Sequence, residues 1–254
     1  MKFRLGPLWN WGPLWRLHST YARQMLIDRE NYTHTPDLYA VWNIKSFMLD
    51  HECQGRARGT YCFWMDAGSF RFGLSGNDLL GPTALARVVE PLFRENEDRV
   101  LLGLMEPLDV SLLSWNRTKG PIDRVMVEGT FFGGTPGSLD WWRTEFFSLH
   151  DEYLQKGFFI GKDQNIMNSL AVLHPTRILF FSGYPQGANG CSQNGWFRFQ
   201  QLLRDPNYRP AACDDLDTKV MRAEELFNAL QETAETGRTP SRGDGRDWRP
   251  WIAV

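Results

Sequence analysis

The residues best suited to chemistry stand at the end of a short apolar segment, where Asp66 follows the run over residues 60–65. The β-branched and aromatic side chains of this run predict a buried strand that delivers the carboxylate at its C-terminal end. Such a carboxylate can bind a divalent cation, Mn²⁺ or Mg²⁺, which can then bridge and neutralise a diphosphate. Arg71 is close enough in sequence to add a phosphate contact. The alternative interpretation is an Asx turn at Asp66 with Arg71 on the surface.

Glycines flank two phenylalanines in the segment over residues 128–134, directly after a predicted strand over 123–129. Backbone N–H groups in a Gly-rich turn can approach a sugar or a phosphate closely, which makes Gly133 and Gly134 candidate ligand-binding positions. The alternative is a tight connection between a strand and a helix, in which the glycines supply positive φ.

Asp163 and Gln164 stand where a short helix over residues 164–173 is predicted to begin. Their acidic and amide side chains could hydrogen-bond to sugar hydroxyls, and Asp163 could orient an acceptor or act as its general base. The alternative is that Asp163 only caps the helix.

The elements that must position these residues alternate along the chain. Periodicity and turn residues predict strands at 60–65, 98–104, 123–129 and 177–181, and helices at 36–50, 81–95, 139–156, 164–173 and 216–234. Pro91 should bend or end the second helix. The third should start at Ser138 as N-cap, stop at Gly157, and bury one aromatic face. This alternation predicts an α/β fold with a mixed or mostly parallel sheet, whose ligands bind at the carboxyl ends of the strands.

The two ends of the chain differ from this pattern. Residues 1–35 combine tryptophans with two Gly-Pro pairs, which predicts an irregular or partly helical segment without a central strand. Residues 235–254 are rich in glycine, arginine and aspartate and predict a flexible tail. The α/β domain should therefore occupy residues 36–234.

Composition excludes several classes. Hydrophobic residues make up 42% and charged residues 23% of the chain, and the net charge of −2 gives no sign of nucleic-acid binding. No apolar run is long enough to span a bilayer, and the N-terminus has no continuous apolar signal region, so we expect a soluble chain, cytoplasmic by default. The four cysteines are widely spaced and are expected to be buried free thiols.

Taken together, the motifs resemble the HtrL/YibB family of glycosyltransferases, also called WlaTC/HtrL-type. The resemblance rests on the segments WMDAGSFR, EGTFFGG and GKDQNIMNSL, with YAVWNIKSFML upstream, and covers residues 36 to 185. It implies a GT-A-like fold, a single domain with a mixed sheet flanked by helices that binds a nucleotide-diphosphate sugar. The implied activity is transfer of the sugar to a glycan, lipid or protein acceptor.

The resemblance also assigns roles to individual residues. It places Asp66 at the metal- or nucleotide-binding carboxylate, and Lys45 on a helix beside the nucleotide phosphates. It places Gly133 and Gly134 beneath the donor sugar. It places Asp163 and Gln164 so that they face the sugar and the acceptor.

Two features differ from the family pattern and leave other functions open. The motif Asp66-Ala67-Gly68 has one carboxylate where many GT-A enzymes have two, and residues 1–35 offer no equivalent of their first strand. One alternative is a non-catalytic carbohydrate- or nucleotide-binding module of the same fold. Another is a metal-dependent phosphohydrolase that pairs Asp66 with Glu128.

Overall fold

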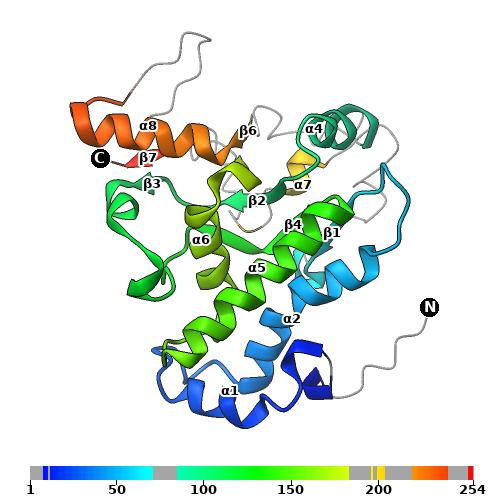
Figure 1. Cartoon of the computed structure of the whole chain (residues 1–254), viewed down its shortest axis with the longest axis vertical. Coiled ribbons are helices and arrows are strands. Elements are labelled where there is room, and N and C mark those ends of the chain that lie inside the picture. The colour runs from blue at the N-terminus through cyan, green and yellow to red at the C-terminus, as the bar shows by residue number, and fades with distance from the viewer. Residues whose placement is uncertain are drawn as a thin grey trace.

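A mixed sheet forms the centre of the molecule (Figure 1). The computed structural model describes residues 8–10, 12–70, 85–182, 196, 199–203, 219–239 and 251–253. Within them the main sheet has five strands in the order β1-β4-β2-β5-β6. The strands span Cys62–Met65 (β1), Val100–Leu104 (β2), Val127–Gly134 (β4), Ile178–Ser182 (β5) and Lys219–Arg222 (β6).

Strand direction brings three carboxyl ends to one edge of this sheet. Strand β4 is antiparallel to both β1 and β2, whereas β2 and β5 are parallel. Strands β1, β2 and β5 therefore run the same way, and the first residues of β4 lie at their carboxyl ends. In an α/β sheet this edge is where ligands usually bind.

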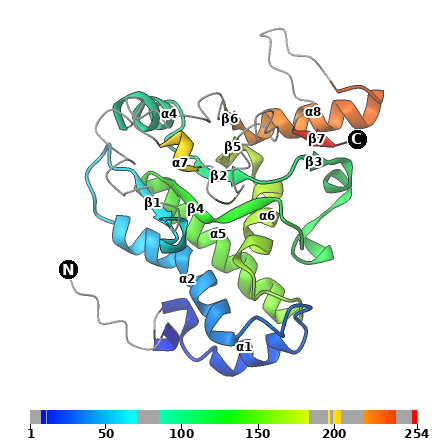
Figure 2. The ribbon, with the colours of Figure 1, turned by 180° about the vertical axis from the view of Figure 1, so that it is seen from behind.

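Side chains alternate between the two faces of the sheet, and each face has its own core. Phe132 and Phe180 join a large core with helices α2 (Pro36–Cys53), α5 (Pro136–Gln155), α6 (Asp163–Leu173) and α8 (Ala223–Thr236). Phe131 and Phe181 join a smaller core with α4 (Glu90–Arg94) and α7 (Phe199–Leu202). Figure 2 shows the same layers from behind. The expected α/β class, a mixed sheet flanked by helices, is confirmed.

Helix α5 forms where it was expected, with a different cap. Thr135 is the N-cap, and its side chain and that of Ser138 bond reciprocally to each other's backbone N–H, so Ser138 is the third helical residue and not the cap. Gly157 follows the helix with φ 77°, as expected of a stop signal. The predicted apolar face is fully buried and comprises Leu139, Trp142, Phe146, Leu149 and Tyr153.

The N-terminal segment contains helices and, in its described residues, no strand. Two short 3-10 helices, Leu8–Asn10 and Gly12–Leu14, precede α1 (His18–Met25), as the Gly-Pro pairs indicated. The segment is nevertheless part of the fold: Tyr21 on α1 is fully buried, and its hydroxyl lies 2.8 Å from Nε2 of His150 on α5.

Three expectations need correction. The Gly-rich segment over 128–134 is not a turn but most of strand β4. In the predicted helix over 216–234, which is described from residue 219, residues 219–222 form strand β6 and the helix begins only at Ala223. The tail expected to be flexible includes buried Trp251 and strand β7 (Ile252–Ala253), which pairs in parallel with β3 (Leu108–Asp109).

The predicted helix over 81–95 is described only from residue 85. It consists of a π-helical turn over Leu85–Val89 followed by α4, and Pro91 stands in the first turn of α4. The wider π-helical turn directly before it is compatible with the N–H that proline lacks and with the room that its ring needs against the preceding turn.

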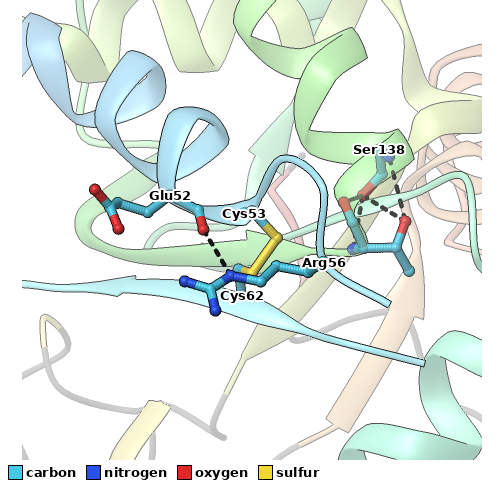
Figure 3. The surroundings of a disulfide bond; sticks show 6 residues. Glu52, Cys53, Arg56, Cys62 and Ser138 are labelled. Atoms are coloured by element: carbon cyan, nitrogen blue, oxygen red, sulfur yellow. Dashed lines mark hydrogen bonds between the residues drawn. A yellow bond between two sulfur atoms is a disulfide. The ribbon is translucent and has the colours of Figure 1, made fainter. Parts of the chain in front are cut away.

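A disulfide joins Cys53 at the end of α2 to Cys62 at the start of β1 (Figure 3). The expectation of free thiols is therefore wrong for this pair, and Cys191 and Cys213 lie outside the described residues. The bond closes the short connection between α2, which carries Lys45, and β1, which leads to Asp66.

Candidate functional site

A polar pocket of about 220 Å³ lies at the carboxyl end of β1. Its walls come from α2, the start of β4, the start of α6 and the N-terminal segment. The lining residues are Glu30, His34, Trp42, Lys45, Asp66, Gly129, Thr130, Lys162, Asp163, Gln164 and Trp196. The pocket thus gathers four of the residues singled out in the sequence, from positions more than a hundred residues apart.

The ammonium group of Lys45 lies at the base of this site, with only 4% of the side chain exposed. Its Nζ donates to the carbonyl oxygen of Gly129 at 2.8 Å. It also lies 3.3 Å from Oδ2 of Asp66 and 3.3 Å from Oδ2 of Asp163. A buried ammonium is tolerated when carboxylates and a carbonyl oxygen surround it in this way. Lys45 therefore holds the two carboxylates of the site together.

Asp66 leaves the strand with both carboxylate oxygens engaged. The indole Nε1 of Trp64 donates to Oδ1 at 2.6 Å, while Oδ2 faces Lys45. The backbone N–H of Asp66 extends the ladder by bonding to the carbonyl oxygen of Thr130 at 2.9 Å. About a third of the carboxylate side chain stays exposed, at 32%.

These contacts do not fit a divalent cation at Asp66. A cation needs several oxygen ligands at about 2–2.6 Å, whereas the ammonium of Lys45 already takes the position between Asp66 and Asp163. In the described residues, the positive charge nearest to both carboxylates is the ammonium of Lys45, and no step of the chemistry below uses a metal at Asp66.

Asp163 is the first residue of α6 and is buried. The N-cap position belongs to Lys162, whose side chain makes no capping bond, and Oδ1 of Asp163 accepts the N–H of Gln164 in the first turn at 2.9 Å. Asp163 therefore combines a local capping bond with its contact to Lys45. Burial raises the pKa of the Asp163 carboxyl and the neighbouring Asp66 adds to this, while Lys45 and the backbone N–H of Gln164 act against it. The net result is a raised pKa, which is characteristic of carboxyl groups in functional sites.

Gly129 is the glycine of the predicted motif that serves the pocket. A Cβ at this position would lie 3.2 Å from both carboxylate oxygens of Asp163, so the bare backbone lets α6 approach β4. Gly133 and Gly134 lie at the other end of the strand, opposite Phe63 and Cys62, and do not line the pocket. Their lack of side chains serves close packing, and the structure does not bring them together with Lys45, Asp66 and Asp163.

The polar residues that follow Asp163 mainly hold neighbouring backbone in place. Gln164 lines the pocket, but its Nε2 donates to the carbonyl oxygen of Val127 at 2.5 Å. Asn168 accepts from the N–H of Val127 and donates to the carbonyl oxygens of Ile122 and Arg124. The motif on α6 therefore fixes the start of β4 as well as presenting Asp163.

The pocket also contains lining residues that the sequence did not single out for chemistry. Glu30 and His34 come from the N-terminal segment, Glu30 forms an ion pair with Lys162, and the carbonyl oxygen of Trp196 lies 2.7 Å from Oγ1 of Thr130. The only signal in the sequence was the short spacing of Asp28, Glu30 and His34 in a segment otherwise rich in aromatic residues.

Two further candidates do not contribute to the described site. Arg71 lies outside the described residues. Glu128 is buried beside Thr130, whose Oγ1 donates to its Oε2 at 2.7 Å, and it does not line the pocket. The second carboxylate near Asp66 is therefore Asp163, and the Asp66–Glu128 pair required by the phosphohydrolase alternative is not formed.

Comparisons of the chain with protein-family models, with curated proteins and with solved structures give no match. None of the helices in the described residues is both long and apolar enough to cross a membrane.

Proposed function

We propose that this protein is a glycosyltransferase that moves a sugar from a nucleotide-diphosphate donor to an acceptor hydroxyl, and that the pocket at the end of β1 binds the transferred sugar. The observation that carries the proposal is the buried contact of Lys45 with both Asp66 and Asp163, at the sheet edge where α/β proteins bind ligands. The motif order that resembles HtrL/YibB glycosyltransferases supports the same function and a GT-A-like fold.

The chemistry of the lining suits a sugar. Carboxylate and amide groups can accept from and donate to neighbouring hydroxyls, and Asp66, Asp163 and Gln164 offer such groups together. The apolar rings of Trp42 and Trp196 in the same lining suit the C–H faces of a sugar ring. The volume of about 220 Å³ is below the roughly 300–1,000 Å³ of pockets for larger ligands, which favours one sugar ring over a whole nucleotide sugar.

The proposed reaction has a simple balance of bonds. The acceptor oxygen forms a bond to the anomeric carbon as the bond from that carbon to the diphosphate oxygen breaks. The diphosphate leaves with the electron pair, and a base in the pocket takes the proton of the acceptor hydroxyl. Lys45 supplies the fixed positive charge nearest to the reacting sugar.

Turnover of nucleotide sugars tests this proposal. The full chain is incubated with a panel of nucleotide-diphosphate sugars and simple hydroxyl acceptors, and released nucleoside diphosphate is measured with and without EDTA. We expect turnover of at least one donor, resistance to EDTA, and a loss of about 10- to 100-fold in Asp163→Asn, the equivalent of a hydrogen bond between the sugar and a charged group. The matched control is Asp140→Asn, an exposed carboxylate on α5. No turnover of any donor would contradict the proposal.

One observation favours a second function, a carbohydrate-binding module without catalysis. Lys45 and Lys162 are the lysines of the described lining, and each is already paired with carboxylates. A departing diphosphate would therefore find no unpaired lysine among these described residues. Specific binding of a sugar or nucleotide sugar, with no turnover by the same preparation, would establish this alternative.

A further inference from the structure

We propose that His34, held by Asp28, is the base that takes the proton of the acceptor hydroxyl. This inference rests on the proposed function and assigns the acid–base step to the N-terminal segment, from which no chemistry was expected.

The first support is the hydrogen bond that orients the imidazole. Nδ1 of His34 lies 2.7 Å from Oδ2 of Asp28. The same carboxylate accepts from the Tyr39 hydroxyl at 2.5 Å and from the backbone N–H of Glu30 at 2.9 Å. A carboxylate that accepts these bonds places the imidazole proton on Nδ1 and leaves a lone pair on Nε2.

The charge state of Asp28 agrees with this geometry. Burial raises the pKa of the Asp28 carboxyl, but the hydrogen bonds from Tyr39, from the Glu30 N–H and from His34 outweigh burial, so the pKa lies below its ordinary value. Asp28 is therefore ionised at neutral pH and acts as the acceptor of the Nδ1 proton.

The second support is the position of the ring. His34 lines the pocket together with Lys45, Asp66 and Asp163, and 14% of its side chain stays exposed. Its ring meets that of Trp42 edge to face, with centroids 5.0 Å apart. No described residue hydrogen-bonds to Nε2, which leaves this atom available to a hydroxyl in the pocket.

The other acid–base groups of the pocket are less suited to the step. Asp66 and Asp163 face Lys45, and Glu30 faces Lys162, so a lysine competes with any proton for each carboxylate. The titratable and charged groups that face His34 are Asp28, Glu30, Tyr39 and Lys162 beside it, and Lys45, Asp66 and Asp163 across the pocket. Among the described groups, the imidazole has a ring nitrogen, Nε2, that is engaged by neither a lysine nor a hydrogen bond.

The step balances without an added reagent. Nε2 of His34 takes the hydroxyl proton as the acceptor oxygen bonds to the anomeric carbon and the diphosphate leaves with the electron pair of the broken bond. The imidazolium that forms is stabilised by the Asp28 carboxylate, as in other His–Asp pairs. It later returns its proton to solvent or to the released diphosphate.

A pH profile of His34→Gln tests the assignment. We expect kcat to fall about 10²–10⁴-fold, the usual contribution of a general base, while donor binding and the melting temperature stay close to wild type. The acidic limb of the wild-type profile, which reports protonation of His34, should disappear. His18→Gln is the control, because His18 is an exposed histidine of the same segment. Asp28→Asn, which removes the anchor of the imidazole, should lower kcat more than it changes KM.

Two further measurements keep the test decisive if His34→Gln does not fold. Imidazole added to His34→Ala should restore part of the turnover, and ¹⁵N NMR of the wild type should show the proton of the His34 ring on Nδ1. An active wild type whose rate and acidic limb survive in His34→Gln, or a His34 ring with its proton on Nε2, would overturn the inference while leaving the proposed function standing. A wild type without turnover of any donor would instead remove the proposed function, and this inference with it.

Discussion

Lys45 is the residue on which the electrostatics of the site depend. Its ammonium faces Asp66, Asp163 and a backbone carbonyl oxygen, and water reaches little of it. A buried ion pair contributes little to the net stability of a protein. Removing one partner is nevertheless strongly destabilising, because it leaves the other charge buried and unpaired. The residue therefore couples the fold to the site.

Replacing Lys45 by Met should destabilise the protein by about 3–5 kcal/mol, the range for breaking a buried pair from one side. The measurement is the free energy of unfolding from urea melts. Lys162→Met, which removes a lysine paired with the partly exposed Glu30, should cost less than about 1 kcal/mol. Adding Asp163→Asn to Lys45→Met should recover part of the loss. Equal costs for the two lysines would contradict a special role of Lys45.

Asp163 gives the site a pH dependence of stability. Burial raises the pKa of its carboxyl in the folded state, so the folded chain holds this proton more tightly than the unfolded chain. Its contribution to stability is present below the unfolded-state pKa and is lost as pH rises through the folded-state pKa. We therefore expect the free energy of unfolding of wild type, relative to Asp163→Asn, to fall as pH is raised from acidic to neutral. A difference independent of pH would contradict the raised pKa.

The sequence predicted some of the residues of the site and missed others. Lys45, Asp66, Asp163 and Gln164 were recognised because motifs and strand ends are local features, and the structure brings them to one pocket. His34 was missed because its role depends on a contact with Asp28 and on docking of the N-terminal segment beside α2. Periodicity within a single segment carries no information on such contacts.

A disulfide joins the helix and the strand that position Lys45 and Asp66. Helix α2 holds Lys45 and ends at Cys53, and strand β1 begins at Cys62 and delivers Asp66. The disulfide between them limits how far the helix can move relative to the strand. Disulfides persist mainly in oxidising compartments.

Replacing Cys53 and Cys62 together by Ser should lower the free energy of unfolding by about 2–3 kcal/mol, because the bond closes a short loop that is otherwise free in the unfolded chain. Donor affinity should fall as well, since α2 and β1 position the two ends of the Lys45–Asp66 contact. On the wild type, the measurement is the melting temperature with and without reductant. An equal melting temperature under the two conditions would contradict the structural role of this bond.

Helix α5 gives the prediction for packing. Phe146 is fully buried among the aromatic rings of Trp142 and Phe147. Phe146→Ala should cost about 3–5 kcal/mol, as expected for emptying a large aromatic site. Glu145→Ala, next to it on the partly exposed face, is the control and should cost less than about 1 kcal/mol. A loss of less than about 1 kcal/mol for Phe146→Ala would contradict the packing.

Elements with strong periodicity were predictable, and elements defined by their partners were not. Helices α2, α5 and α6 formed close to the expected residues because apolar spacing and capping residues mark them. The segment over 128–134 was predicted to be a turn because it is rich in glycine. In β4, however, each glycine leaves room for a close neighbour, which is Asp163 at Gly129, the backbone of Cys62 at Gly133 and Ser138 at Gly134. Strand β6 similarly depends on pairing with β5.

At the scale of the whole molecule, the N-terminal segment completes both the core and the site. Leu14 and Tyr21 are fully buried, and Gln24 bonds to the backbone of Phe158 and Ile160, just before Asp163. The sequence correctly indicated that this segment forms no central strand in its described residues. It did not indicate that the segment would bring Glu30 and His34 into the pocket, since this follows only from tertiary packing.

Calorimetric titration with nucleotide-diphosphate sugars in the presence of EDTA measures donor binding without a divalent cation. We propose that the pocket of Lys45, Asp66 and Asp163 binds the donor sugar and that the lysine is its resident cation. We expect wild type and Asp140→Asn to bind the same donor with equal affinity, and Asp163→Asn to bind it about 10- to 100-fold more weakly, the equivalent of a hydrogen bond to a charged group. Equal affinity of Asp163→Asn and wild type, or binding only when Mn²⁺ is added, would contradict it.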